Sequence, residues 1–379
     1  MKKFLCAVLA LSVLFCSACT ALENDIENKS EESGTKLPES EESGDSSLPC
    51  DFSSDSHVIS SDTESTDTES FPEPLTSDVS EFSGADSESA DSSESMEPVS
   101  EDSSCEAGYS DTAAITAEIA ALRNSGFQTN IPESSVLSEL KAYLEGTGYG
   151  YFYCDLEYNA YAAYGCDRIF KTASTAKLPY IKYLCTLADS GDIDLDGTMV
   201  FEERHKTVGS GIMKNMASGA SFSIRTLIDY TLRYSDNIAY SMLLERFGLK
   251  AYLESLRALG VNYSTVNGYA DCTASEMAAL LFDTARYNGK NSSLILDAGC
   301  NASYNYQIGA ELREYKVLQK YGAIKPGNVA YHDIAVVYAP HPYILVIYTT
   351  IDYESAAKNI PFRKIARLTD NLNKALYED

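Results

Sequence analysis

The sequence predicts an α+β domain whose single antiparallel sheet is built from strands near both ends of that domain. Three observations lead to this expectation. Two aromatic-rich segments, residues 148–156 and 160–164, have the composition and spacing of a strand pair joined by a turn. The middle of the domain carries helical patterns, and three further strand-like segments follow residue 315. We therefore expect a five-stranded sheet flanked by a helical subdomain.

Each element is predicted from the spacing of its apolar residues. Ile115, Ile119 and Leu122 recur at helical spacing, and a second amphipathic helix is expected over 136–144. A closing helix with one buried stripe is expected at the C-terminus. The remaining elements are expected as helices over 175–188, 224–234, 238–246, 250–259, 274–287 and 361–377, and as strands over 316–319, 333–338 and 343–350.

The N-terminus has the pattern of an export signal. Two lysines precede an apolar run of about a dozen residues, too short for a membrane span, and Ser-Ala-Cys follows at 17–19. A Cys directly after Ser-Ala resembles a bacterial lipobox. We predict that residues 1–19 are a lipoprotein-type signal with Cys19 as the lipidation site, so that the protein lies outside the cytoplasm on the cell membrane. Cleavage near Ala21, giving a free secreted protein, is the alternative.

The formal net charge of −27 is spread unevenly along the chain. Residues 22–105 contain 25 acidic residues, two lysines and 24 serines, but only three aromatic side chains. Such a segment cannot bury enough apolar surface to offset the loss of chain entropy. We predict that residues 20–111 are a disordered spacer and residues 112–379 the folded domain. Because the chain offers no large basic face, nucleic-acid binding is not expected.

Five cysteines fall in the predicted domain. Cys154 and Cys166 lie on either side of the predicted hairpin, which suggests a disulfide between them. No C-x-x-C pair occurs, so a zinc site is not expected. The chemistry that the following motifs indicate requires neither a metal nor an organic cofactor.

The most specific chemical signal is an S-x-x-K motif formed by Ser174 and Lys177 at the start of a predicted helix. Their spacing places both side chains on one helix face, about one turn apart. The first N–H groups of a helix have no partner within it, and a lysine packed in an apolar environment loses its proton readily. The motif predicts a serine nucleophile beside its base. An exposed lysine on a surface helix would produce the same spacing by chance.

Two further motifs follow in chain order. Residues 235–237 read Ser-Asp-Asn, and residues 320–322 read Lys-Tyr-Gly at the end of a predicted strand. Together with S-x-x-K, they resemble the three motifs of the penicillin-recognising serine hydrolases, and most closely those of the class A β-lactamase family. The resemblance covers residues 132–379 and implies the class A β-lactamase fold.

The resemblance implies a catalytic role for three residues. Ser174 would be the nucleophile and Lys177 its base or proton relay. Ser235 would pass a proton toward the leaving nitrogen, whereas Asp236 would cap backbone groups without reacting.

The resemblance also implies how substrate is bound. Asn237 would bind the substrate amide, and Lys320 would attract the substrate carboxylate. The N–H groups of Ser174 and Ala323 would form the oxyanion hole. The substrate-binding residues are thus expected to be Asn237, Lys320, Tyr321, Gly322 and Ala323.

Two departures from the family pattern bear on activity. Efficient family members deacylate with a Glu in the omega loop, but the corresponding residues 260–270 contain no carboxylate. Without such a base an ester on Ser174 would persist, since general base catalysis typically contributes about 10²–10⁴-fold. In addition, Tyr321 replaces the small hydroxyl residue of the third motif. Residues 325–327, Lys-Pro-Gly, offer another third motif but leave too few residues before the strand expected at 333.

The sequence therefore predicts a serine hydrolase and leaves three functions open. The resemblance favours β-lactam hydrolysis. The missing omega-loop Glu favours a cell-wall D-Ala-D-Ala peptidase or penicillin-binding protein, whose substrate is a peptidoglycan stem peptide. Tyr321, and an omega loop about a dozen residues shorter than the family usually has, favour a non-catalytic surface module with the same fold. We expect the domain to be a monomer.

Overall fold

The computed structural model describes residues 104–261, 265–266, 268–324 and 330–377. The predicted signal with Cys19, and the predicted spacer up to residue 103, lie outside this part of the chain, as does the alternative motif at 325–327. Among the helices described here, none combines the length and apolar character needed to cross a membrane.

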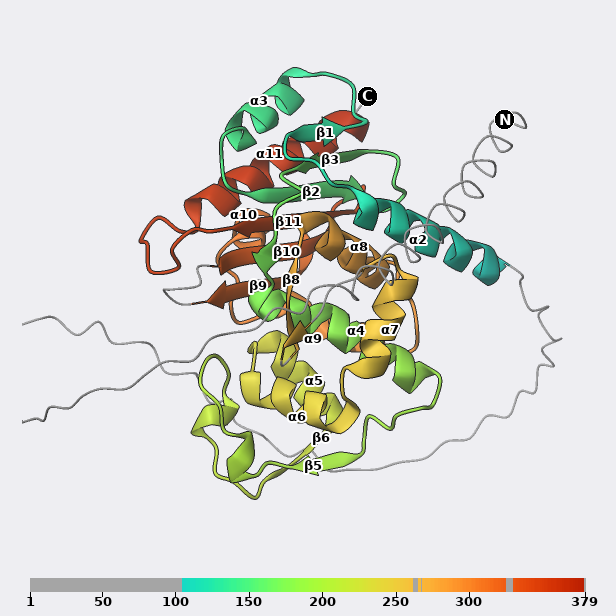
Figure 1. The fold of residues 1–379 in the computed structure, drawn as a ribbon, viewed down its shortest axis with the longest axis vertical. Coiled ribbons are helices and arrows are strands. Elements are labelled where there is room, and N and C mark those ends of the chain that lie inside the picture. The colour runs from blue at the N-terminus through green and yellow to red at the C-terminus, as the bar shows by residue number, and fades with distance from the viewer. Residues whose placement is uncertain (1–103, 262–264, 267, 325–329, 378–379) are drawn as a thin grey trace, which may run out of the picture. The chain divides into compact units, whose positions relative to one another are not determined.

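The sheet is antiparallel and contains six strands in the order β1-β3-β2-β11-β10-β9 (Figure 1). Its origin in both ends of the domain is confirmed. The expected count of five omits β1, which pairs with β3 but has only three residues, too few to show an alternating pattern. The strands are β1 (Phe127–Thr129), β3 (Tyr161–Tyr164), β2 (Gly150–Asp155), β11 (Tyr343–Thr349), β10 (Ala330–Tyr338) and β9 (Lys316–Ile324).

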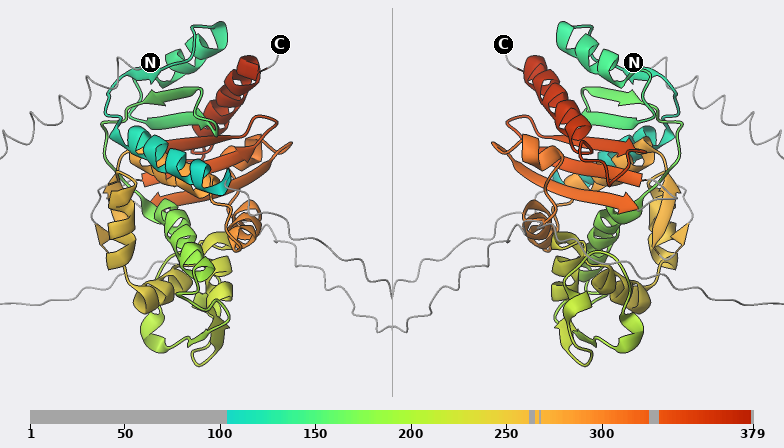
Figure 2. Two further views of the ribbon diagram at one scale, coloured as in Figure 1. Left: turned by 90° about the vertical axis from the view of Figure 1, so that its right-hand side faces the viewer. Right: turned by 90° about the vertical axis from the view of Figure 1, so that its left-hand side faces the viewer.

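Helices cover both faces of the sheet (Figure 1 and Figure 2). Helices α3 (Ser135–Leu144) and α11 (Ile360–Tyr377) pack on one face, and α8 (Ala274–Ala285) with α2 (Ser104–Ala121) on the other. Strand side chains alternate between two cores. Phe152 and Ile334 belong to the core on the α8 side of the sheet, whereas Ala335 belongs to the core on the α11 side.

The helical subdomain lies beyond the β9 edge of the sheet (Figure 1). All of its predicted helices are present, and α9 was not predicted because its sequence, SSLILDAGC, is short and lacks a clear helical period. The helix α2 begins at Ser104, eight residues before the predicted start of the domain. The other helices are α4 (Lys177–Asp189), α5 (Ile224–Arg233), α6 (Asn237–Phe247), α7 (Lys250–Ala258), α9 (Ser292–Cys300) and α10 (Ile308–Glu311).

The suggested disulfide between Cys154 and Cys166 is wrong, since both thiols are free and buried. In the β2–β3 register Cys154 lies opposite Tyr161, whereas Cys166 contacts the carbonyl oxygen of Tyr151, three residues earlier on β2. Three strand residues span about 10 Å, and a disulfide requires Cα atoms within about 7 Å.

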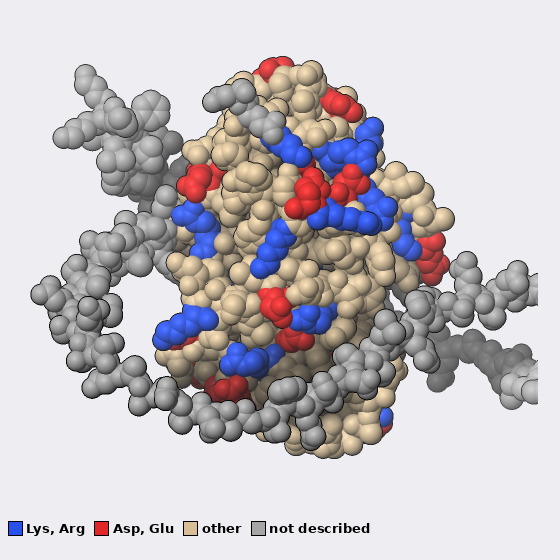
Figure 3. Space-filling view, turned by 180° about the vertical axis from the view of Figure 1, so that it is seen from behind, with Lys and Arg blue, Asp and Glu red and all other residues tan. Residues whose placement is uncertain are grey.

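Charged side chains of both signs are interspersed over the face shown in Figure 3. Exposed ion pairs of the described residues include Lys171 with Asp271 at 3.4 Å. A surface of this kind has no continuous basic stripe of the sort that tracks a phosphate backbone.

Candidate active site

Ser174 lies in a single 3-10 turn, η1 (Ala173–Ala176), which leads directly into α4. The turn is held by β4 (Phe170–Lys171), which pairs with β8 (Tyr269–Cys272). Ala173 has a φ of +47°, a left-handed conformation that a non-glycine residue adopts at a cost and that often marks functional turns. Ser174 is half-buried, whereas its three neighbours in the turn are buried, so it is the residue of the turn that keeps accessible surface.

Lys177 is fully buried at the start of α4. Its Nζ donates to the Ser235 carbonyl oxygen at 2.6 Å and to Asn237 Oδ1 at 2.7 Å, and lies 3.5 Å from Ser235 Oγ. Burial, together with the nearby Lys320 ammonium, lowers the pKa of Lys177 well below its ordinary value. A neutral amine has two N–H groups, which these two closest acceptors use, and its lone pair is then free to accept a proton.

Ser235 connects the two lysines of the site. Lys320 Nζ donates to Ser235 Oγ at 2.8 Å from the β9 side, opposite Lys177. Ser235 has a φ of +52°, and its carbonyl oxygen also accepts from Ser210 Oγ at 2.7 Å. The loop that carries Ser210 therefore holds Ser235 in a conformation that directs its hydroxyl between both amines.

Asp236 is fully buried and caps the N-terminus of α6. Its Oδ1 accepts from the N–H groups of Ile238 at 2.9 Å and Ala239 at 3.0 Å, and its Oδ2 from that of Met213 at 2.8 Å. The carboxylate thus joins the S-D-N segment to the loop before it, as a structural group.

Glycines allow three backbone segments to converge on these side chains. A Cβ on Gly211, whose φ is +123°, would lie 2.3 Å from the Asp236 carboxylate. A Cβ on Gly322 would lie 3.0 Å from the Thr172 carbonyl oxygen and 3.1 Å from the Ser174 nitrogen. This approach brings the backbone of Gly322 and its neighbour Ala323 beside the nucleophile, as an oxyanion hole requires.

Lys320 lies inside β9, which continues to Ile324 rather than ending before the motif as expected. Burial lowers the pKa of Lys320 to about 7, partly offset by the Asp333 carboxylate. Burial likewise raises the pKa of Asp333 on β10 to about 7. Asp333 Oδ2 accepts from the Ile308 N–H at 3.1 Å, while its buried Oδ1 has no hydrogen-bond partner among the described residues.

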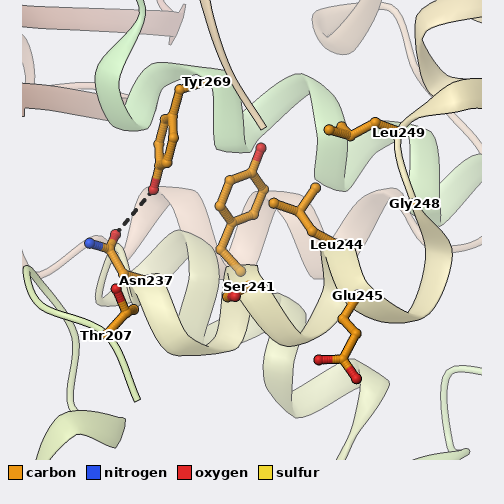
Figure 4. A pocket seen from close by; sticks show the side chains of 9 residues that line it. Thr207, Asn237, Ser241, Leu244, Glu245, Gly248, Leu249 and Tyr269 are labelled. Atoms are coloured by element: carbon orange, nitrogen blue, oxygen red, sulfur yellow. Dashed lines mark hydrogen bonds between the residues drawn. The ribbon is translucent and has the colours of Figure 1, made fainter. Parts of the chain in front are cut away.

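A cavity of about 680 Å³ opens next to Asn237 (Figure 4). Tyr269 closes one end, where its hydroxyl donates to Asn237 Oδ1 at 3.4 Å. Among the described lining residues Glu245 is the one carboxylate, and it is engaged by Arg204 at 2.6 Å and His205 at 3.2 Å. The lining residues are Thr207, Asn237, Tyr240, Ser241, Leu244, Glu245, Gly248, Leu249 and Tyr269.

The structure brings Ser174, Lys177, Ser235, Asn237, Lys320, Tyr321, Gly322 and Ala323 into one region, with Asp236 beneath them. Sequence reasoning missed Ser210, Tyr269 and Asp333, because none of them belongs to a motif. His332 precedes Asp333 and is buried behind the nucleophile turn, where its Nε2 donates to the Lys171 carbonyl oxygen at 2.9 Å. Among the described residues, no group of three or more His, Cys, Asp or Glu side chains is arranged to hold a metal ion.

Residues 134–375 match the model of the beta-lactamase enzyme family. The chain belongs to this family. No curated protein sequence matches it.

This β-lactamase family member also resembles solved structures. A β-lactamase from Sphaerobacter thermophilus is 21% identical, with a TM-score of 0.56 over 65% of this chain and 99% of that chain. PBP-A is 15% identical, with a TM-score of 0.57 over 67% and 100% of the two chains. A PBP-A mutant, described as an acyl-enzyme complex with penicillin G, is 16% identical, with a TM-score of 0.58 over 65% and 99%. At these identities the likeness establishes the fold of this β-lactamase family member.

Proposed function

We propose that this protein is a serine hydrolase that is acylated on Ser174 by β-lactams and releases the acyl group slowly. The observation that carries this proposal is the position of Ser235, whose hydroxyl lies 3.5 Å from Lys177 Nζ and 2.8 Å from Lys320 Nζ. Such an arrangement can move a proton from the nucleophile to a leaving nitrogen without a cofactor.

The proposed acylation has a balanced proton path. Ser174 Oγ attacks the lactam carbonyl while the neutral Lys177 amine takes its proton. The lactam C–N bond breaks, and Ser235 gives its hydroxyl proton to the leaving nitrogen. Lys177 then returns the first proton to Ser235, which restores both groups. The N–H groups of Ser174 and Ala323 stabilise the oxyanion.

Deacylation lacks an equivalent base in the described part of the site. Glu245 is bound to Arg204, and this hydrogen bond lowers the pKa of the carboxyl group, which makes it a weaker base. Tyr269 faces Asn237, but burial raises the pKa of its phenol to about 12, so it does not accept a proton near neutral pH. We therefore expect the ester to persist.

A second candidate function is that of a cell-wall D-Ala-D-Ala peptidase or penicillin-binding protein. The lack of a deacylation base in the described part of the site favours this function too, because such proteins form the same ester with penicillin. The likeness in fold to PBP-A supports it equally. Either activity agrees with export and lipid attachment at Cys19, which we propose from the N-terminal sequence alone.

Intact-mass spectrometry with benzylpenicillin, beside Ser174→Ala, tests the proposal. We expect the native protein to gain the mass of one penicillin molecule and to keep it for hours, whereas Ser174→Ala gains none. Hydrolysed penicillin without a stable adduct would show fast deacylation instead. Neither adduct nor hydrolysis would favour the non-catalytic surface module.

The rate of acylation should depend on pH through Lys320 and Asp333, whose pKa values both lie at about 7. Lys320 is charged below this pH and loses its charge as the pH rises through it, so the second-order rate constant with benzylpenicillin should fall on the alkaline side. Asp333→Asn removes the anion that favours the charged form of Lys320. In this variant the decline of the rate constant on the alkaline side should begin at a lower pH. An unchanged pH profile would contradict the assignment of this decline to Lys320.

A further inference from the structure

Two tyrosine rings cover the side of the site on which Ser235 and Lys320 lie. Tyr321 follows Lys320 in β9, and Tyr304 belongs to the loop after α9. Their ring centroids are 4.6 Å apart, with planes inclined by 34°. Together with Ser235 and Lys320, these rings line a space too small to admit a water molecule. Because that space is filled, a leaving group that takes its proton from Ser235 would meet the outer, accessible ring surfaces of the pair.

Lys320 directs its hydrogen-bond donors into the protein. Its Nζ donates to Ser235 Oγ at 2.8 Å and to the Tyr321 carbonyl oxygen at 2.9 Å, and lies 4.6 Å from the centroid of the Tyr321 ring. An ammonium group has three N–H groups, of which the two oxygen acceptors use two, while the ring contact is a cation–π interaction. Because Lys320 is also only 1% exposed, a substrate carboxylate finds at most one N–H group of it uncommitted.

The aromatic pair itself is uncharged. Burial raises the pKa of the Tyr321 phenol, and the neighbouring Tyr304 adds to this effect, so the ring stays neutral at physiological pH. Both residues are half-buried and thus keep part of their ring surface accessible. A neutral aromatic surface favours stacking with another ring and carries no positive charge to offset the desolvation of a carboxylate.

We propose that Tyr304 and Tyr321 form a leaving-group subsite that selects uncharged aromatic leaving groups over leaving groups bearing a carboxylate. The inference rests on the proposed acylation of Ser174. In the reaction with an aryl ester, the bond from Ser174 Oγ to the acyl carbon forms, and the ester bond to the phenol oxygen breaks. The proton of Ser174 passes through Lys177 and Ser235 to the departing phenolate. β-Lactams and D-alanine termini, which carry a carboxylate here, are then slow acylating agents.

Two aryl esters of phenylacetylglycine that differ in one carboxylate test this subsite: one releases phenol and the other 3-hydroxybenzoate. We expect the native protein to react at least about tenfold faster with the uncharged ester. Tyr321→Thr should shift the ratio of the two rate constants toward the charged ester by about tenfold or more, while Tyr321→Phe keeps the native ratio. Tyr306→Thr alters an exposed tyrosine in the Tyr304 loop and serves as the control.

Because the result is a ratio measured on one preparation, partial unfolding lowers both rates and leaves the ratio unchanged. A native preference for the charged ester, or a ratio unmoved by Tyr321→Thr while Ser174-dependent reaction persists, would overturn the subsite and leave the proposed function intact. Absence of Ser174-dependent reaction with both esters and with benzylpenicillin, in every variant, would overturn both.

Discussion

Replacing Lys177 by methionine should slow acylation of Ser174 by about 10²–10⁴-fold, because it removes the amine that accepts the nucleophile's proton. Methionine fills a similar volume. The native amine is fully buried and donates to the Ser235 carbonyl oxygen and to Asn237 Oδ1, so its removal should also lower the free energy of unfolding by about 1–3 kcal/mol. The time course of adduct formation with benzylpenicillin measures the rate, and thermal unfolding checks the fold.

Lys171→Met is the matched control for this substitution. Lys171 lies three residues before the nucleophile, but its side chain is half exposed and paired with Asp271 on the surface. It should acylate at the native rate. If Lys177→Met also reacted at the native rate while remaining folded, another group would have to be the base.

Replacing Asp236 by alanine should lower the free energy of unfolding by about 3–5 kcal/mol, the largest loss we expect from a single site residue. The carboxylate accepts three buried backbone N–H groups, from Met213, Ile238 and Ala239, and alanine would leave all three without a partner. Urea denaturation measures the change. Asp236→Asn retains one acceptor oxygen and should lose less.

Asp271→Ala provides the comparison at an exposed aspartate. Its side chain is 59% exposed, and its ion pair with Lys171 should contribute at most about 1 kcal/mol. Equal losses from the two alanine variants would mean that the Asp236 contacts do not hold the S-D-N segment in place.

Local patterns were sufficient where a feature depends on neighbours in sequence. The apolar stripe of α11 and the aromatic composition of β2 predicted both elements, and the S-x-x-K spacing predicted that Ser174 and Lys177 share one face. Short elements escaped prediction: β1 has three residues and α10 has four, too few for a pattern to repeat recognisably. The resemblance of the three motifs to a known family, not their spacing, indicated that they meet.

Local sequence patterns predicted the α+β class, the helical middle and the residues of the three motifs, because hydrophobic period and motif identity are local properties. The tertiary structure alone decided which distant groups touch. It separated Cys154 from Cys166 by strand register, placed Asp333 near Lys320 and brought the rings of Tyr304 and Tyr321 into contact. These contacts join residues far apart along the chain, and they depend on how strands and loops pack, which no local pattern encodes.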